Sequence, residues 1–120
     1  MNYILPMSNA HGSKWIRPER RLAIYARDGF SCAYCGAEDA LSLDHVMPRE
    51  LGGGHENENL VTCCVSCNSA RRDSSMREWF VMLRDRGIIT DGLAVKIRRT
   101  VGRKVDIALG KRLLAARQGI

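Results

Sequence analysis

The sequence predicts an α+β fold in which a small hairpin and helix are stapled by cysteines and flanked by further helices. Two Cys-x-x-Cys pairs enclose a glycine-rich stretch whose strand-like pieces are short. Apolar residues recur at helical spacing before the first pair and after the second. We therefore expect an N-terminal helix, a stapled hairpin–helix core, and two or three C-terminal helices. A chain of 120 residues is too short for two independent hydrophobic cores, so we expect one functional site.

The chain divides into three segments by pattern. Residues 1–17 carry no periodicity and are expected to form a loose arm. Residues 18–75 hold both cysteine pairs and are expected to form the core. Residues 76–120 are helical in pattern and rich in arginine and lysine, which predicts a basic extension packed on that core.

Standard end signals mark two of the predicted helices. Pro18 suits the first turn of a helix, and Gly29 can take the left-handed conformation that closes it. Ser75 and Glu78 have the spacing of a capping box, and Gly87 ends the helix that they begin. One face of this second helix is expected to be core: Met76, Trp79, Phe80 and Leu83.

The last part of the chain has an apolar residue at every fourth position from Leu93 to Leu113, which indicates helix. Gly102 and Gly110 weaken one continuous rod, because a glycine inside a helix costs about 1 kcal/mol relative to alanine. We therefore expect two helices or one bent helix.

Between the cysteine pairs, only residues 41–46 and 60–62 have the character of strands. Side chains alternate along a strand, so Asp44 and His45 should point to opposite faces at the end of the first one. Three glycines at 52–54 form the connection back. A two-stranded hairpin with such a long loop is not stable by itself, which predicts that a staple holds it.

The cysteines supply that staple. Cys32 with Cys35, and Cys64 with Cys67, form two knuckles that can each present two thiolates to one ion. Four thiolates in a tetrahedral cage suit Zn²⁺ and leave no open position, so the ion is expected to be structural. A redox-active pair would need a thioredoxin-like strand–helix setting, which the sequence lacks. Cys63 and Cys67 would form a looser pair than the symmetric knuckles, so Cys63 is expected to be a small core residue.

Charge is distributed unevenly along the chain. Residues 1–70 hold six Lys/Arg against eight Asp/Glu, a balance of −2, and residues 71–120 hold thirteen against five, a balance of +8. This asymmetry favours a polyanionic partner, although a solvated helical surface would give the same count. The basic residues expected to meet nucleic acid are Arg71, Arg72, Arg98, Arg99, Arg103 and Lys104.

The sequence gives no sign of membrane insertion or export. No run of about 18 apolar residues is present, so no membrane-spanning helix is expected. The first 13 residues lack the basic-then-apolar order of a signal peptide. We therefore expect a soluble, cytoplasmic protein.

A further set of residues lies between the knuckles and is not explained by zinc alone. In chain order it comprises Asp44-His45, Gly52-Gly53-Gly54, Asn59-Leu60-Val61 and Cys67-Asn68. In this order, from about residue 20 to residue 73, the sequence resembles the HNH endonuclease family, whose fold is a ββα-metal hairpin and helix. The resemblance covers less than half of the chain.

The resemblance implies a role for each polar residue. His45 takes the place of the general base that accepts a proton from the attacking water. Asn59 takes the place of the asparagine that braces the loop and orients the histidine. Asp44 and Asn68 would hold a divalent ion, with Asn68 at a position that is often histidine in the family. The implied reaction is hydrolysis of phosphodiester bonds in DNA, leaving 3′-hydroxyl and 5′-phosphate ends.

The chemistry of these residues agrees with such roles. A neutral imidazole titrates near pH ~6.5, so His45 can accept a proton at neutral pH. Carboxylate and amide oxygens suit Mg²⁺ or Mn²⁺, and two ligands leave room for water and a phosphate. Each residue also has an ordinary structural reading. His45 alone would be a strand histidine, and the other three alone would cap helices or brace turns.

Two other functions stay open at this point. A non-catalytic, zinc-stabilised nucleic-acid-binding module would share the cysteines and the charge, but it has no need of Asp44 and His45 together with Asn68. A protein–protein adaptor would use the apolar side of residues 93–113. The resemblance also allows a place in a phage or its bacterial host, within a larger DNA-processing or packaging assembly, and RNA as the substrate. His55, in the glycine-rich loop, could approach the metal or a phosphate, but a solvent-facing loop residue is the commoner case.

Overall fold

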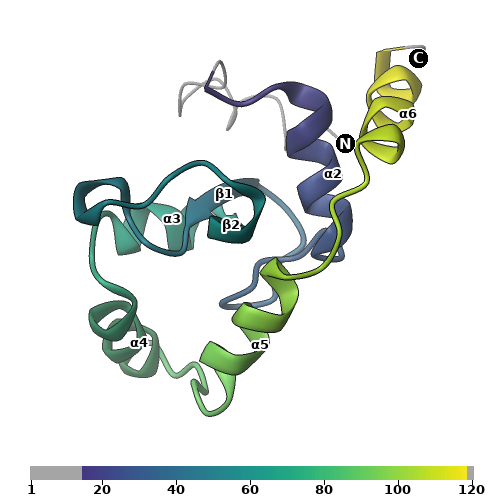
Figure 1. Ribbon diagram of the computed structural model, residues 1–120. Helices are drawn as coiled ribbons and strands as arrows, with labels where there is room; N and C mark the ends of the chain where they lie inside the picture. Colours follow the sequence, from purple (N-terminus) through teal and green to yellow (C-terminus); the bar gives the residue numbers. More distant parts are fainter. Residues whose placement is uncertain (1–14, 119–120) are drawn as a thin grey trace.

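A computed structural model describes residues 15–118 and shows a hairpin flanked by helices (Figure 1). The predicted α+β class is confirmed, with one helix before the core and three after it. Most of the predicted arm, residues 1–14, lies outside the described residues. No helix within residues 15–118 is long and apolar enough to cross a membrane. The elements are, in chain order, α2 (Pro18–Arg27), β1 (Leu41–His45), the 3-10 turns η2 (Arg49–Leu51) and η3 (Asn57–Asn59), β2 (Leu60–Cys64), α3 (Val65–Arg71), α4 (Met76–Asp85), α5 (Leu93–Val101) and α6 (Ile107–Gln118).

The two strands pair antiparallel, with Leu41 opposite Cys64 and His45 opposite Leu60. β2 is longer than predicted because Cys63 and Cys64 continue the ladder, so the second knuckle begins in the last residue of the strand. The Cys64 sulfur then accepts a hydrogen bond from the backbone N–H of Cys67 at 3.4 Å and caps α3. For this reason α3 begins before Cys67 rather than at it.

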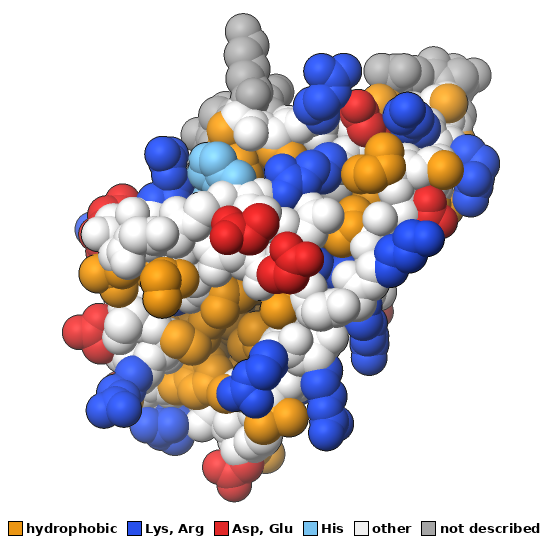
Figure 2. All heavy atoms as spheres, in the orientation of Figure 1, with side chains coloured by type: hydrophobic (Ala, Val, Ile, Leu, Met, Phe, Trp, Pro, Cys, Tyr) orange, Lys and Arg blue, Asp and Glu red, His pale blue; other side chains and the backbone are white. Residues whose placement is uncertain are grey.

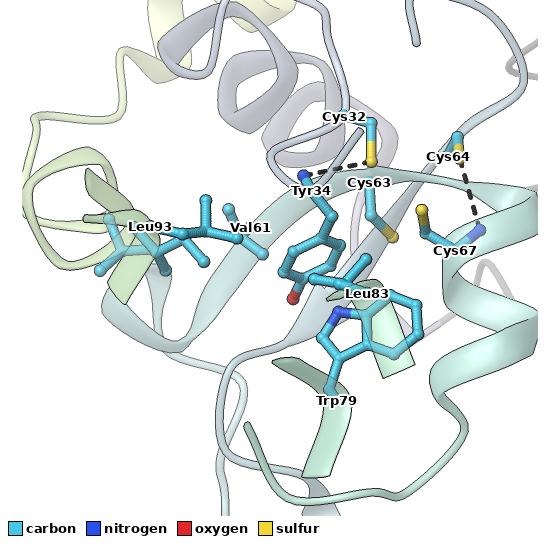
Figure 3. Packing of buried hydrophobic residues seen from close by; sticks show 11 residues of the cluster. Cys32, Tyr34, Val61, Cys63, Cys64, Cys67, Trp79, Leu83 and Leu93 are labelled. Atoms are coloured by element: carbon cyan, nitrogen blue, oxygen red, sulfur yellow. Dashed lines mark hydrogen bonds between the residues drawn. The ribbon is translucent and has the colours of Figure 1, made fainter. Parts of the chain in front are cut away.

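Both faces of the hairpin are buried, which explains why polar residues inside β1 have little contact with solvent. One face packs on α2 through Leu41, Leu43 and Leu60. The other face packs on α4 and α5 through Val61 and Cys63, together with Tyr34 of the first knuckle, against the predicted core residues Trp79 and Leu83 (Figure 3). The C-terminal helices therefore share their core with the hairpin.

A buried ion pair fastens the end of α2 to the hairpin. Arg27 Nε lies 2.6 Å from Asp28 Oδ1, and both side chains are at most 2% exposed. Arg27 also donates to the carbonyl oxygens of Asn57 and Leu60, while Asp28 Oδ2 accepts the backbone N–H of Thr62. The sequence pattern had indicated only that a helix ends here.

The predicted helix ends are confirmed where a side chain or a glycine sets them. Gly29 has φ +76° after α2, and Gly87 has φ +85° after α4. At the start of α4, Ser75 Oγ accepts the N–H of Glu78, and the Glu78 carboxylate accepts the N–H of Ser75. The capping box therefore satisfies two backbone donors that would otherwise lack partners.

The periodic region forms two helices, and the chain bends between them at residues 102–106. Gly110 does not interrupt α6. It lies where α6 packs on α2, and a Cβ built at this position would stand 2.0 Å from the carbonyl oxygen of Glu19 and 3.0 Å from the Cβ of Ala23. The glycine is thus needed for close approach of the two helices.

Gly110→Ala should destabilise the protein by about 1–3 kcal/mol, because the added methyl group forces α6 away from α2. Urea-induced unfolding followed by circular dichroism measures this. The matched control is Gly102→Ala, where the nearest atom to an added Cβ is 3.5 Å away, and which should leave stability nearly unchanged. Identical unfolding curves for the two variants would contradict the packing role.

Candidate active site and cysteine cluster

The four knuckle cysteines come together at one point. Cys32 and Cys35 lie in the loop after α2, Cys64 ends β2, and Cys67 lies in the first turn of α3. Their sulfur atoms all lie within 4.8 Å of one another, so the group can hold a metal ion. Cys63 is fully buried and outside this group, as predicted for a core residue.

The surroundings of Cys32 favour thiolate over thiol, whereas burial raises the pKa of Cys35 and the hydrogen bond to Cys32 raises the pKa of Cys67. The backbone N–H groups of Tyr34 and Cys35 point at the sulfur of Cys32, at 3.4 and 3.5 Å. A hydrogen bond from the Cys67 thiol lowers the pKa of Cys32 to about 5. A negatively charged sulfur is the form that binds metal ions, so the cluster suits a cation.

A polar pocket of about 430 Å³ opens at the end of β1. Its lining brings together Asp44, His45 and Asn68, which the sequence places on a strand and a later helix. Trp15 and His55 line the same pocket. Three of the four predicted catalytic residues therefore face one space, and the fourth, Asn59, lies outside its lining.

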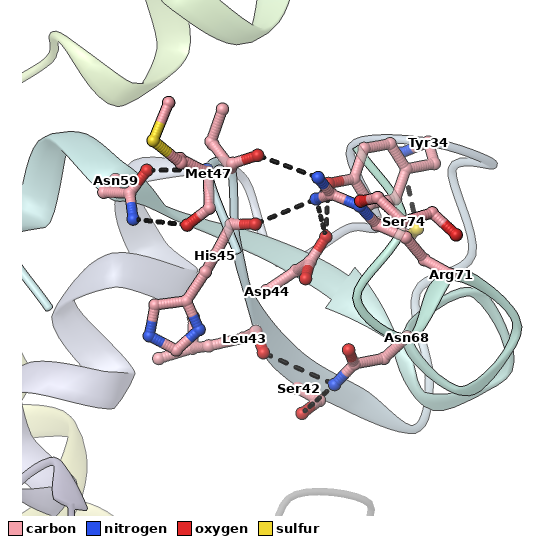
Figure 4. A network of polar contacts seen from close by, with 12 residues as sticks. Tyr34, Ser42, Leu43, Asp44, His45, Met47, Asn59, Asn68, Arg71 and Ser74 are labelled. Carbon is pink, nitrogen blue, oxygen red and sulfur yellow. Dashed lines mark hydrogen bonds and ion pairs between the residues drawn. The ribbon is translucent and has the colours of Figure 1, made fainter. Parts of the chain in front are cut away.

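The Asp44 carboxylate is fixed through one of its two oxygens. Its Oδ2 accepts a hydrogen bond from the Tyr34 hydroxyl at 2.6 Å and pairs with Arg71 Nη1 at 2.7 Å (Figure 4). Oδ1 accepts no hydrogen bond from the residues that the structure describes. This leaves one carboxylate oxygen for another partner.

The Asn68 side chain is fixed through its amide nitrogen. Its Nδ2 donates to the Ser42 hydroxyl at 3.3 Å and to the Leu43 carbonyl at 3.4 Å. The amide oxygen is thereby turned away from these groups and accepts no hydrogen bond from the described residues (Figure 4). Asp44 and Asn68 line the same pocket, and carboxylate and amide oxygens are the donors that suit Mg²⁺ or Mn²⁺.

His45 points to the other side of β1, as predicted from the alternation of a strand (Figure 4). Its Nε2 lies 2.9 Å from Nδ1 of His55, so one ring donates and the other accepts. Trp15 packs against both rings, with centroids 5.1 Å from His45 and 4.7 Å from His55. Burial, and next the neighbouring His55, lower the pKa of His45, which favours the neutral imidazole.

Asn59 braces the loop between the strands. Its amide oxygen accepts the backbone N–H of Met47 at 2.8 Å, and its amide nitrogen donates to the carbonyls of Met47 and Gly54. Gly53 lies under the same loop, where a Cβ would stand 1.7 Å from the Met47 carbonyl oxygen. The loop that follows His45 is therefore tied to the start of β2.

Arg71 does not occupy the position expected of a phosphate contact. It is fully buried, and its guanidinium donates to Asp44, to the carbonyls of His45 and Val46, and to that of Ser74. A group with every donor turned inward is not available to a nucleic acid, so Arg71 is removed from the predicted interface. Arg72, in contrast, is exposed and lines the pocket.

The other predicted basic residues lie on the surface. Four side chains at the end of α5 and in the turn after it are exposed: Arg98, Arg99, Arg103 and Lys104. Figure 2 shows Lys and Arg side chains spread over the side of the molecule formed by α5 and α6. This surface has the charge that a polyanion requires.

Three residues at the site were not identified from the sequence. Tyr34 is recognisable only as the residue inside a knuckle, and nothing in its spacing indicates a contact with Asp44. For His55 the sequence leaves open a solvent-facing position and a place near the metal or a phosphate, and the structure places it partly buried against His45. Trp15 fell in a segment predicted to be a loose arm. All three contacts depend on the folded chain, not on local sequence.

Comparisons with known proteins agree on the region that contains these residues. A family model described as HNH endonuclease matches residues 32–79. Residues 32–79, called the HNH region below, are therefore similar to the HNH endonuclease family. This HNH region holds both knuckles, the hairpin, α3 and the first residues of α4.

One curated protein is also similar in sequence to part of this chain. The chain is 35% identical over 57 residues to the CRISPR-associated endonuclease Cas9 of Corynebacterium diphtheriae. The matched part makes up 44% of the present chain and 5% of that protein. No solved structure matches the chain at a significant level. The likeness is confined to the HNH region, and the chain spans only a small part of the length of that relative.

Proposed function

We propose that the protein is a metal-dependent endonuclease that hydrolyses phosphodiester bonds in DNA. The observation that supports this is the meeting of two free oxygen donors, on Asp44 and Asn68, with the His45 imidazole around one pocket of the HNH region. A module that only binds nucleic acid has no need of this combination.

His45 is the proposed general base. Its lowered pKa keeps the ring neutral near pH 7, so one ring nitrogen can take a proton from water. The oxygen of that water forms a bond to phosphorus, and the bond from phosphorus to the 3′ oxygen breaks on the opposite side. The products are a 5′-phosphate and a 3′-hydroxyl. Asn59 acts indirectly, by fixing the loop that follows the histidine.

Asp44 Oδ1 and the Asn68 amide oxygen would hold Mg²⁺ or Mn²⁺. The ion, when bound, supplies charge stabilisation to the phosphate and the leaving oxygen. Arg71 compensates the buried charge of Asp44 from the other side. The carboxylate therefore has a charged partner in its buried position, and its second oxygen is available to the pocket.

Replacing His45 by alanine should lower the cleavage rate at least ~100-fold, because the proton acceptor is lost. Nicking of supercoiled plasmid with and without added Mg²⁺ or Mn²⁺ measures it. Asn57→Ala, in the same loop region but outside the pocket lining, is a control for nonspecific effects on the loop. Zinc content and circular dichroism should match the unchanged protein.

Two outcomes would count against the proposal. Full cleavage by His45→Ala would remove His45 as the base. No cleavage by either protein under any metal condition, with DNA still bound, would instead support a non-catalytic nucleic-acid-binding module.

The cysteine cluster is proposed to hold a structural zinc ion. Four sulfur ligands from two knuckles give the closed, tetrahedral donor set typical of such sites. The hairpin between the knuckles is too small to be stable alone, and a structural zinc site can supply on the order of 10 kcal/mol of apparent binding free energy. Folding of the core should therefore depend on the ion.

Cys64→Ser should lose zinc and unfold at lower temperature, whereas Cys63→Ala should keep one zinc ion per chain. The two positions are adjacent, yet only the Cys64 sulfur belongs to the cluster. Elemental analysis after gel filtration and thermal unfolding test this. Zinc retained in Cys64→Ser and lost in Cys63→Ala would overturn the ligand assignment.

The exposed basic residues are proposed to bind phosphates of the nucleic acid independently of its base sequence. Alanine at Arg98, Arg99, Arg103 and Lys104 together should weaken DNA binding and make its salt dependence less steep, by up to about 0.9 in slope for each phosphate contact removed. Fluorescence anisotropy over a range of NaCl concentrations measures the slope. Arg77→Ala, an exposed arginine on α4, is the control. An unchanged slope in the fourfold variant would place the DNA elsewhere.

A further inference from the structure

Tyr34 links the cysteine cluster to the proposed catalytic carboxylate. It is the third residue of the first knuckle, between Ala33 and Cys35, and its hydroxyl reaches Asp44 Oδ2 at 2.6 Å. The side chain is 4% exposed. The phenol therefore donates this hydrogen bond from a buried position.

The position of the Tyr34 ring is set by the elements around it. Its backbone N–H is directed at the Cys32 sulfur, and the preceding residue, Ala33, donates to the Thr62 carbonyl at 2.9 Å. Trp79 of α4 meets the ring edge-on, with centroids 5.5 Å apart and planes at 86° (Figure 3). Both the knuckle and the core thus fix where the hydroxyl can point.

The hydrogen bond from Tyr34 makes the two carboxylate oxygens of Asp44 differ in their partners. Tyr34 and Arg71 both use Oδ2, and no described residue uses Oδ1. A carboxylate free to turn about its bond to Cβ would exchange the two oxygens. With Oδ2 fixed at two points, Oδ1 remains the carboxylate oxygen available in the pocket that Asp44 and Asn68 both line.

We propose that Tyr34 is a positioning residue that orients Asp44 for a divalent cation and couples that site to the cysteine cluster. This inference rests on the proposed function. It makes the first knuckle more than a staple, because the loop that holds two of the four sulfurs also holds the donor that orders the metal ligand. Hydrogen bonds of this kind to a metal ligand typically change metal affinity or activity 10–100-fold.

The test is Tyr34→Phe, which removes the hydroxyl and keeps the ring in the core. Zinc content and the thermal unfolding midpoint should stay near those of the unchanged protein. The dissociation constant for Mn²⁺, measured by electron paramagnetic resonance, should rise about 10–100-fold. The Mn²⁺ concentration that gives half-maximal plasmid nicking should rise in parallel, while kcat at saturating Mn²⁺ recovers most of its value.

The matched control is Tyr25→Phe. Tyr25 is also buried, and its hydroxyl donates to the Leu41 carbonyl, away from Asp44. Its Mn²⁺ affinity should not change. If the unchanged protein binds Mn²⁺ and nicks DNA, and Tyr34→Phe has the same affinity and metal requirement, the positioning role is wrong while the nuclease stands. If the unchanged protein does neither, both fall.

Discussion

The meeting of four sulfur atoms within 4.8 Å is the constraint on which the rest of the fold depends. It joins a loop after α2 to the point where β2 becomes α3. A hairpin of two five-residue strands, with a long loop between them, has too little core to hold this geometry by itself. Once the knuckles are closed, the hairpin presents two faces, and α2 covers one while α4 and α5 cover the other.

The residues proposed to act in the reaction include Asp44 and His45 at the end of β1, whose side chains lie on opposite faces of the hairpin. Asp44 points inward to Tyr34 and Arg71, and His45 points to the side of Trp15 and His55, yet both line one pocket. The buried pair between Asp44 and Arg71 gives the carboxylate a charged partner there. Arg71, which the sequence places among the expected phosphate contacts, is instead the counter-ion of Asp44.

Much of this arrangement could be predicted because it rests on local chemistry. The spacing of the knuckles, the capping box of α4 and the glycines that close α2 and α4 all act over a few residues. The inward turn of Arg71, the His45–His55 contact and the close packing at Gly110 depend on segments far apart in the chain. The sequence does not distinguish a buried arginine from an exposed one. It also does not distinguish a glycine that lets a neighbouring helix pack closely from a glycine that interrupts its own helix.

The central claim is that the stapled hairpin brings two oxygen ligands to one divalent ion beside His45. Crystals of the zinc-bound protein soaked in Mn²⁺ would test it most directly, through anomalous diffraction at the manganese edge. The account predicts one manganese ion bound by Asp44 Oδ1 and the Asn68 amide oxygen, in the pocket lined by His45. The account would be contradicted if manganese bound only at other places on the protein, or if this pocket stayed empty of manganese beside an intact Asp44–Arg71 ion pair.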